Sequence, residues 1–446
     1  MKTTQRLLRS GLLALGFAAA TLAAADGAPS RPGIDAPELA ALGQYAVGVR
    51  SITLVDRDQL DLGAIDPRSG VPARHDRRLK VEIWYPARPA AGAMPVTYED
   101  AMESEPPAPP ARFRIQGLAL RDAKAEGGRF PLVIVAHGYG NVPVGMSWLT
   151  ENLASKGYVV AAIRHEDMYL NPAGFPQAAL RRPLDIAFVA RELQGSLGKS
   201  GEVDPTRTAL IGYSMGGYGV LAAAGATLDP AGGLVTRVPG GLLAPYARGG
   251  ALSASLVAPA VKAVVAFAPA GGAFGAFGAF GAFGAEGVAG IKSPLLLIAG
   301  DHDLTVDYTS GARAYFDQAI NSNRYLLTFL GGGHALGLGP APPEMQTDLW
   351  NQDWFEDAVW RKDRLIGISL HFVTAFLDRY LKDDASRSAY IDGLVVESSA
   401  GKWDAPQGTP WSARSPGGDI TLWKGFQRRH ATGLSLMHAE ANSAPK

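Results

Sequence analysis

The sequence contains no cysteine among its 446 residues. This absence excludes disulfide bonds, attachment of a lipid to an N-terminal cysteine, and catalysis by a cysteine nucleophile. A net charge is also absent, because 42 basic and 42 acidic residues balance each other. We therefore expect neither nucleic acid nor an anionic membrane surface as a partner, since no global field would attract either of them.

An apolar run without any charge occurs near the N-terminus, at residues 11–22. Three basic residues precede it, and three alanines ending at Ala25 follow it. This order is typical of a secretory signal peptide, and the apolar part is short for a membrane span. We therefore expect residues 1–25 to be removed, with cleavage near Ala25, and the protein to be periplasmic or secreted without stable membrane insertion. The alternative is an uncleaved anchor.

The remaining chain, about 420 residues, is long enough for one large α/β domain with insertions. Residues 26–44 are rich in Ala, Pro and Gly and are expected to form a loose leader, followed by a single domain at residues 45–440. Insertions are expected at residues 88–110, 227–259 and 271–290. The first of these is Pro-rich and acidic, and we interpret it as a solvated loop because it offers little to a core.

Apolar strand patterns alternate with helical patterns through the middle of the chain. Two strands with alternating burial are expected at 45–55 and 79–85, and buried strands at 130–136, 158–163, 208–211, 264–268, 295–299 and 325–330. Helices are expected at 147–156 and 183–197, the latter with Pro183 in its first turn. Strands separated by helices indicate right-handed βαβ crossovers. The pattern predicts a mostly parallel sheet of about eight strands with helices on both faces.

Residues 212–217 read Gly-Tyr-Ser-Met-Gly-Gly and lie between a predicted strand and a helix-forming run. A strand that turns into a helix within so few residues strains the central residue and requires small neighbours. Such a turn exposes the hydroxyl of Ser214 at the edge of the sheet. The backbone N–H of Met215, at the helix N-terminus, could stabilise an oxyanion there. The alternative is a surface turn, in a chain that contains 54 glycines.

A second turn follows the predicted strand at 130–136 and reads His-Gly-Tyr-Gly at residues 137–140. The backbone N–H of Tyr139 is expected to be the second oxyanion donor, and its ring could line the acyl pocket. His137 precedes Ser214 in the chain, whereas this architecture orders its triad as serine, acid, histidine. We therefore do not expect His137 to be the base.

A serine nucleophile needs a histidine base, and the base needs a carboxylate that orients it. Asp301 and Asp303 both follow the predicted strand at 295–299, and Asp303 is favoured by its position three residues after the glycine that ends the strand. His334 follows the last strand and three glycines, so we expect it to be the base. The cluster at residues 165–167 (His-Glu-Asp) lacks the spacing of a helical zinc motif and is expected to be structural. No metal site is expected.

The chain resembles the predicted dienelactone-hydrolase branch of the α/β-hydrolase superfamily, which is similar to the secreted platelet-activating-factor acetylhydrolases. The matching pieces are residues 45–48 (Tyr-Ala-Val-Gly), 81–87 (Val-Glu-Ile-Trp-Tyr-Pro-Ala), 137–140, 182–185 (Arg-Pro-Leu-Asp), 212–217, 294–303, 333–334 and 423–426 (Trp-Lys-Gly-Phe). The resemblance extends from about residue 45 to residue 438 and implies an α/β-hydrolase fold. Dienelactone hydrolases use a cysteine nucleophile, which is absent here, so the family name does not indicate the substrate.

The resemblance implies a serine carboxylic-ester hydrolase without a cofactor, acting on short or medium acyl esters or small aromatic esters. Ser214 would attack, His334 would transfer the proton, Asp303 would orient His334, and the N–H groups of Met215 and Tyr139 would bind the oxyanion. Alternatives with the same triad are a lipase- or cutinase-like polyester hydrolase, an amidase, a peptidase or an acyltransferase. A non-catalytic exported binding protein is a further alternative, disfavoured by the complete set of three residues.

A low-complexity repeat, Ala-Phe-Gly taken four times, occupies residues 273–284. We interpret it as a loop lengthened by repetition. The alternative is an apolar lip for acyl or aromatic groups, because loops at the carboxyl ends of parallel strands surround the active site.

Overall fold

A computed structural model of the protein describes residues 32–65, 72–166, 174–273, 281–404, 406–414 and 421–443. The expected signal peptide and residues 274–280 of the Ala-Phe-Gly repeat lie outside these ranges. Export and the apolar lip therefore stay predictions. None of the helices in the described ranges has the length and apolar character needed to cross a membrane.

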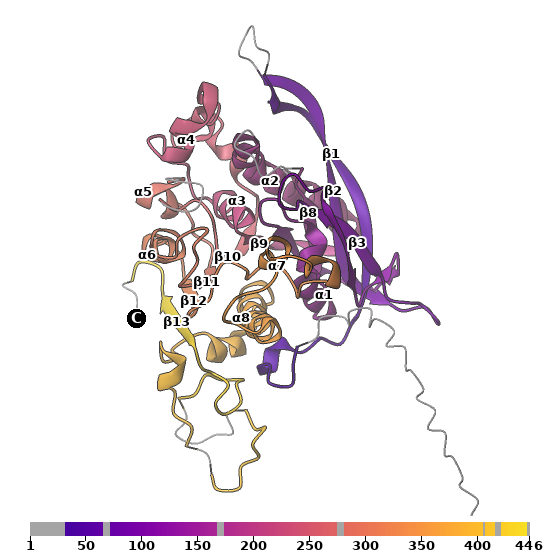
Figure 1. The fold of residues 1–446 in the computed structure, drawn as a ribbon, viewed down its shortest axis with the longest axis vertical. Helices are drawn as coiled ribbons and strands as arrows, with labels where there is room; N and C mark the ends of the chain where they lie inside the picture. The colour runs from indigo at the N-terminus through magenta and orange to yellow at the C-terminus, as the bar shows by residue number, and fades with distance from the viewer. Residues whose placement is uncertain are drawn as a thin grey trace, which may run out of the picture.

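The centre of the molecule is a sheet of eleven strands (Figure 1). Its eight principal strands are β1 (Ala46–Ile65), β2 (Pro72–Arg88), β7 (Phe130–Ala136), β8 (Val159–Arg164), β9 (Val203–Tyr213), β10 (Val261–Phe267), β11 (Leu295–Gly300) and β12 (Arg324–Phe329). Their spatial order is β1-β2-β8-β7-β9-β10-β11-β12. Strand β2 is antiparallel to β1 and β8, and all pairs from β8 to β12 are parallel. This is the strand order of the α/β-hydrolase fold, so the predicted fold class is confirmed.

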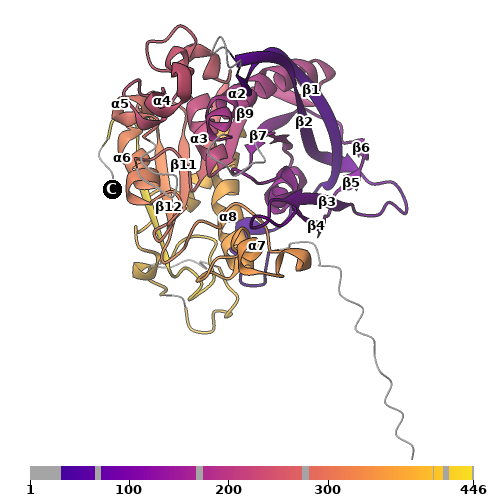
Figure 2. The same cartoon turned by 45° about the horizontal axis from the view of Figure 1, so that its top comes forward.

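Three strands of the sheet were not predicted, namely β5 (Leu120–Arg121), β6 (Lys124–Ala125) and β13 (Leu434–Ala439). Strand β13 pairs antiparallel with β12. The β1–β2 hairpin is also longer than predicted, because its charged part continues as strand (Figure 2). Opposite charges face each other there, in the pairs Arg57–Asp76 and Arg74–Asp58, and such cross-strand pairs stabilise an exposed ladder.

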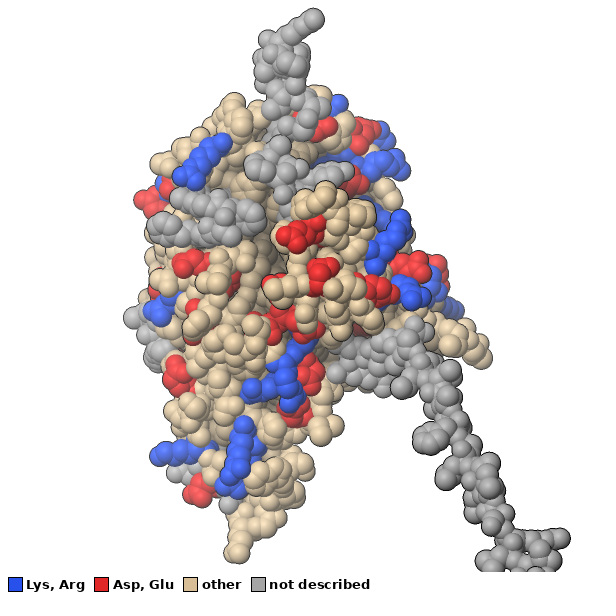
Figure 3. Space-filling view, viewed as in Figure 1, with Lys and Arg blue, Asp and Glu red and all other residues tan. Residues whose placement is uncertain are grey.

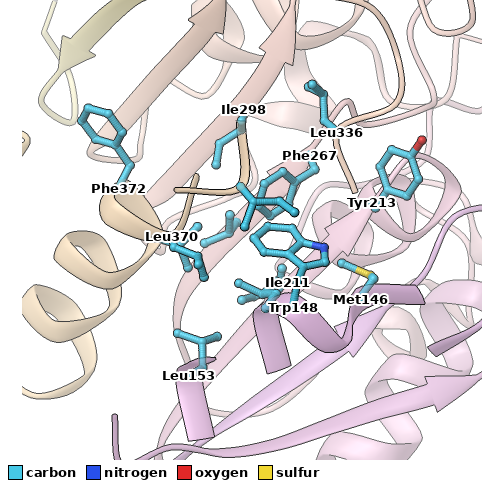
Figure 4. Packing of buried hydrophobic residues seen from close by; sticks show 14 of the residues in the cluster. Met146, Trp148, Leu153, Ile211, Tyr213, Phe267, Ile298, Leu336, Leu370 and Phe372 are labelled. Carbon is cyan, nitrogen blue, oxygen red and sulfur yellow. The ribbon is translucent and has the colours of Figure 1, made fainter. Parts of the chain in front are cut away.

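Helices cover both faces of the sheet, as predicted. Helices α1 (Ser147–Ser155) and α8 (Lys362–Leu381) pack on one face, and α2 (Phe175–Ser200), α3 (Met215–Ala223), α5 (Gly284–Val288) and α6 (Ala314–Gln318) on the other. Alternate residues of β7 serve the two cores: Val133 and Val135 face α1 and α8, whereas Leu132 and Ile134 face α2 and α3. Figure 4 shows part of the first core, where Trp148 of α1 approaches Ile211 and Phe267 of the sheet.

The prediction for the second helix is wrong at its start, because α2 begins at Phe175 and contains Pro183 in its interior. A proline within a helix leaves the carbonyl four residues earlier without its usual N–H donor. Here that carbonyl is that of Ala179, and the buried Tyr218 hydroxyl donates a hydrogen bond to it at 2.9 Å. A tertiary contact from α3 therefore supplies the missing donor, and the sequence pattern alone does not reveal it.

The interpretation of residues 88–110 as a solvated loop is also wrong in part. Strand β3 (Thr97–Met102) pairs with β4 (Ala111–Gln116) in a separate two-stranded sheet. Tyr98 and Met102 are buried, Glu99 is exposed, and Asp100 pairs with Arg164. The Tyr98 hydroxyl accepts a hydrogen bond from Trp84 Nε1 and donates one to Glu151 Oε1, both at 2.7 Å. One side of the acidic strand β3 therefore packs against the core.

The remaining elements are short and lie in the connections. They are η1 (Glu38–Ala40), η2 (Pro143–Met146), α4 (Gly233–Arg237), η3 (Pro239–Gly241), η4 (Ala244–Tyr246), η5 (Ser253–Leu256), η6 (Thr309–Arg313), η7 (Pro343–Met345), α7 (Leu349–Asp353), η8 (Ala385–Tyr390) and η9 (Ser398–Ala400). Phe283, the last phenylalanine of the Ala-Phe-Gly repeat, is buried and stacks on Tyr218 with ring centroids 5.5 Å apart. This part of the repeat belongs to the core on the α2–α3 face.

Candidate active site

The turn between β9 and α3 holds Ser214 in a strained conformation, with φ 52° and ψ −115°. Glycines on both sides make this turn possible. A Cβ on Gly212 would lie 2.2 Å from the carbonyl oxygen of Gly216, and a Cβ on Gly216 would lie 2.1 Å from that of Ala136. A non-glycine residue at either position would collide with the backbone. Strain of this kind is often associated with a functional site.

Three side chains from separate elements form a hydrogen-bonded chain at this turn. His334 Nε2 lies 3.0 Å from Ser214 Oγ, and His334 Nδ1 lies 2.7 Å from Asp303 Oδ2. The carboxylate of Asp303 accepts a hydrogen bond from the Nδ1–H of His334, which leaves Nε2 as the acceptor for the serine hydroxyl. The structure therefore brings together the three residues expected from the sequence in the order that a serine nucleophile requires.

The Asp303 carboxylate is buried but well supplied with donors. Burial alone would raise its pKa, yet His334 and the backbone N–H groups of Val306 and Thr305 together lower the pKa below its usual value. These two N–H groups donate to Oδ1 at 3.0 and 2.8 Å, which leaves Oδ2 for His334. The group is consequently an anion at neutral pH, oriented toward the imidazole.

Asp301, the other candidate acid, has a different place. Its Oδ1 accepts a hydrogen bond from the backbone N–H of Gly331 at 2.6 Å and lies 2.8 Å from Nδ1 of the exposed His302. It thereby links the loop after β11 to the loop after β12. Its contacts shape the loop that carries His334, whereas Asp303 contacts the imidazole itself.

The two expected oxyanion donors are the backbone N–H groups of Met215 and Tyr139. Met215 is the first residue of α3, so its N–H is one of those that a helix start leaves without an intrahelical acceptor. Tyr139 follows β7 and lines the same pocket as Ser214. Whether these N–H groups bind an oxyanion stays a prediction.

The pocket above Ser214 has a volume of about 290 Å³. It is lined by Tyr139, Tyr213, Ser214, Thr305, His334, Trp350, Asp353 and Trp354. The two tryptophans lie edge to face with ring centroids 6.4 Å apart. The sequence did not indicate Thr305, Asp353 or the two tryptophans as pocket residues. The spacing of Trp350 and Trp354 by four residues, soon after His334, is nevertheless a signal for one aromatic helix face.

The residues around His137 and His165 form a buried network behind the site. His137 Nδ1 lies 2.8 Å from the Gly138 carbonyl oxygen, and its Nε2 accepts a hydrogen bond from the His165 N–H at 3.2 Å. His165 Nδ1 lies 2.9 Å from Asp185, which also forms two hydrogen bonds of 2.8 Å with Arg77. Burial lowers the pKa of His137. These contacts support the structural interpretation of His165, while Asp167 lies outside the described residues.

In the described ranges, no group of three or more His, Asp or Glu side chains could hold a metal ion. The charges on the face drawn in Figure 3 are of both signs, with acidic side chains gathered near its centre, where Figure 1 draws α7.

The chain was compared with known protein families, curated proteins and solved structures. Residues 122–231, which contain the strained turn, match the model of a family described as PETase, PET hydrolase-like. No curated protein matches the chain. Among solved structures, a ferulic acid esterase from Streptomyces cinnamoneus is 19% identical, with 78% of this chain and 94% of that chain covered and a TM-score of 0.44. The strand order of the sheet is that of the α/β-hydrolase fold, and residues 122–231 are similar to PET hydrolase-like proteins.

Proposed function

We propose that the protein is a serine hydrolase of carboxylic esters. The observation that carries this proposal is the hydrogen-bonded chain Ser214–His334–Asp303 at a strained strand-to-helix turn. Similarity of residues 122–231 to PET hydrolase-like proteins supports an ester as the substrate. The acid, base and nucleophile stand on the ends of β11, β12 and β9, where the sheet fixes their separation.

The reaction follows from this geometry. Nε2 of His334 accepts the Ser214 hydroxyl proton while Oγ attacks the ester carbonyl carbon, and Asp303 stabilises the imidazolium that forms. The N–H groups of Met215 and Tyr139 donate to the oxyanion. His334 then protonates the leaving alcohol, and the acyl group stays on Ser214. Water, deprotonated by His334, attacks the acyl-enzyme, and His334 returns this proton to Ser214 Oγ as the carboxylic acid leaves.

The size of the pocket supports small substrates. A volume of about 290 Å³ lies at the lower end of the range for small-molecule sites, and aromatic side chains form much of its wall. We infer short or medium acyl esters, or small aromatic esters. A second candidate substrate is a polyester chain, which the match to PET hydrolase-like proteins favours.

Two finer assignments belong to the same proposal. The segments at residues 81–87 and 182–185 support the dienelactone-hydrolase-like branch near the platelet-activating-factor acetylhydrolases. The apolar leader at residues 11–22 supports export to the periplasm or the medium. N-terminal sequencing of the mature protein would test the leader.

The decisive experiment has two parts. A fluorophosphonate probe should label the wild-type protein and leave the Ser214→Ala variant unlabelled, which separates an active serine hydrolase from a binding protein. Rates with p-nitrophenyl esters from acetate to decanoate, with matched p-nitroanilides and with a polyester film then separate esterase, amidase and polymer hydrolase. Labelling of Ser214 without turnover of any ester would contradict the proposed function.

A further inference from the structure

The segment that carries His334 onward to α8 is strongly acidic. Residues 331–360 contain five acidic residues and no lysine or arginine. The acidic residues are Glu344, Asp348, Asp353, Glu356 and Asp357. Negative charge therefore lies beside the pocket, on the same segment as two of its aromatic walls.

Four of these five acids have structural partners. Glu344 pairs with Arg114 at 3.3 Å, and Asp348 caps α7 by accepting from the Asn351 N–H. Glu356 accepts from the Ala341 N–H, and Asp357 from the Gly333 N–H. These contacts hold the segment in its conformation, and they account for the positions of these four side chains.

Asp353 differs from the other four. Its side chain is exposed and, within the described residues, has no ion pair or hydrogen bond. The nearest basic side chains along the chain are engaged elsewhere: Lys362 donates to the Ala335 carbonyl, and Arg361 pairs with Asp35 and Asp363. Asp353 nevertheless lines the pocket above Ser214.

The helical spacing places Asp353 on the same side of the segment as two aromatic rings. Trp350, Asp353 and Trp354 are related as i, i+3 and i+4, so they share one face of α7 and its C-cap residue Trp354, and all three line the pocket. Tyr139 stands in the same pocket wall. Aromatic faces combined with an unpaired carboxylate attract an organic cation, because the ring quadrupoles and the anion act in the same direction.

We propose that the substrate of this site is an ester that carries a positive charge, such as a quaternary ammonium group, a few bonds from the scissile carbonyl. This inference rests on the proposed ester hydrolysis. Trp350, Trp354 and Tyr139 contact the cation, Asp353 neutralises it, and the acidic segment raises the local concentration of cationic esters. A neutral ester of the same shape gains only the apolar part of these contacts.

Matched pairs of esters test the charge alone. Acetylcholine and 3,3-dimethylbutyl acetate carry the difference on the alcohol, whereas p-nitrophenyl 4-(trimethylammonio)butanoate and p-nitrophenyl 5,5-dimethylhexanoate carry it on the acyl chain. Each kcat/KM is divided by the rate constant of that ester with hydroxide, to remove intrinsic reactivity. We expect the cationic member of at least one pair to be preferred by about tenfold or more at low ionic strength.

Variants identify the source of the preference. Asp353→Asn should shrink the ratio within the preferred pair at least about fivefold, and Trp350→Leu should also lower it. Glu286→Gln removes the same charge from an exposed, distant position and should leave the ratio unchanged. Hydrolysis of all four esters without a preference for the cation would overturn the cation site while leaving ester hydrolysis intact. Hydrolysis of none would instead contradict the proposed function.

A second, independent observation concerns Arg182 of α2. Its guanidinium is fully buried and donates hydrogen bonds to the carbonyl oxygens of His137 and Gly138, the latter at 2.9 Å. The Gly138 carbonyl oxygen also lies 2.8 Å from His137 Nδ1 and accepts from the Asn141 N–H at 3.2 Å. Several donors therefore hold this carbonyl in one orientation.

The held carbonyl belongs to the same peptide unit as the Tyr139 N–H. In a trans peptide the C=O and N–H point in opposite directions, so Arg182 directs the Tyr139 N–H away from itself. We infer that Arg182 is a positioning residue for the second oxyanion donor. Its charge also polarises the peptide, which strengthens the N–H as a donor.

Chemical rescue separates positioning from general stability. Arg182→Ala should lower kcat about 10- to 100-fold, with KM changed less than threefold, and weaken an alkyl boronic acid inhibitor by a similar factor. Guanidinium ion at a few millimolar should restore kcat, whereas urea at the same concentration should not. Should the alanine variant fail to fold, Arg182→Lys keeps the charge with one point donor and should show the same pattern, less strongly. A folded variant with wild-type kcat and boronate affinity would overturn the assignment.

Discussion

The active site joins two regions built in different ways. The turn from β9 into α3 joins two regular elements. Glycine is required at Gly212 and Gly216, because a Cβ at either position would collide with neighbouring backbone. The segment at residues 330–361 is largely irregular, and side-chain carboxylates that accept backbone N–H groups hold it in place. The first region presents the nucleophile, while the second carries His334 and the aromatic wall. The end of β9 fixes Ser214, whereas the irregular segment both holds His334 at hydrogen-bond distance from Ser214 and forms the wall that would select substrates.

The largest expected effect comes from the regular region. Ser214→Ala should lower kcat for a p-nitrophenyl ester by roughly 10⁴- to 10⁶-fold, because no other hydroxyl can occupy the turn. Since the substitution removes one oxygen and keeps the strained backbone, the free energy of unfolding should change by less than about 1 kcal/mol. Kinetics and urea unfolding on the same preparation test both statements. A variant that retains a tenth of the activity would show that Ser214 is not the nucleophile.

The second prediction compares two aspartates that lie two residues apart. Asp303→Asn should lower kcat about 10⁴-fold, because an amide at this position favours the wrong tautomer of His334. Asp301→Asn is the matched control and should cost less than about tenfold, since Asp301 contacts Gly331 rather than the imidazole. Steady-state kinetics of both variants at pH 8 measure the difference. The reverse order of effects would assign the acid to Asp301.

The principal strands could be predicted because apolar runs buried on both faces of a parallel sheet are long and uninterrupted, as at β7 and β11. Ser214, Asp303 and His334 could be located because each follows the end of such a strand within a few residues. The start of α2 could not, since it depends on the Tyr218 hydroxyl reaching the Ala179 carbonyl. Strand β13 likewise depends on pairing with β12, far away in the chain.

The pocket wall was missed for a related reason. Trp350 and Trp354 show helical spacing, yet α7 is only five residues long, and its place over Ser214 depends on the cap at Asp348. A pattern of so few residues does not indicate which element it covers. Long-range contacts determine this, and they are not local properties of the sequence.

The third prediction concerns the buried network in which Asp185 contacts Arg77 and His165. Asp185→Asn should lower the free energy of unfolding by about 3–5 kcal/mol at pH 7, because the buried Arg77 would lose its carboxylate. Burial opposes ionisation of Asp185, but Arg77 and His165 lower its pKa below the usual value. This stabilisation is therefore complete above the unfolded pKa, about 4, and is lost as the pH falls further.

Urea unfolding of the wild type and of Asp185→Asn between pH 7 and pH 3 tests this prediction. The difference in the free energy of unfolding between the two proteins should be constant above about pH 5 and should become smaller toward pH 3. The comparison variant Asp204→Asn, near the start of β9 with a partly exposed carboxylate, should lower the free energy of unfolding by less than about 1 kcal/mol. A gap that widens on acidification would contradict the lowered pKa.

The fourth prediction concerns the contacts that attach the β3–β4 hairpin to the core. Tyr98→Phe should lower the free energy of unfolding by about 1–3 kcal/mol, because Trp84 Nε1 and Glu151 each lose a buried partner. The effect on kcat should be less than threefold, since the hairpin β3–β4 contributes no residue to the pocket. Thermal unfolding followed by circular dichroism and esterase kinetics measure the two quantities. A large loss of activity with unchanged stability would mean that this hairpin communicates with the site.

The smallest effect is expected at Lys156, which joins the end of α1 to the N-terminal segment. Its ammonium group donates to the Leu39 carbonyl at 2.6 Å and to Thr374 Oγ1 at 2.8 Å, and burial lowers the pKa of Lys156 to about 7. In the unfolded chain the pKa is about 10.4, so folding releases a proton between these two values. The lowered pKa therefore reduces the free energy of unfolding, by the full amount below pH 7 and by less as the pH rises toward 10.

Lys156→Met removes this destabilisation together with the two hydrogen bonds. The stability difference, variant minus wild type, should therefore fall by about 1 kcal/mol or more between pH 6 and pH 9, measured by urea unfolding. The exposed Lys262→Met variant should show no such trend, and a flat difference for Lys156→Met would mean that the ammonium stays charged in the folded protein.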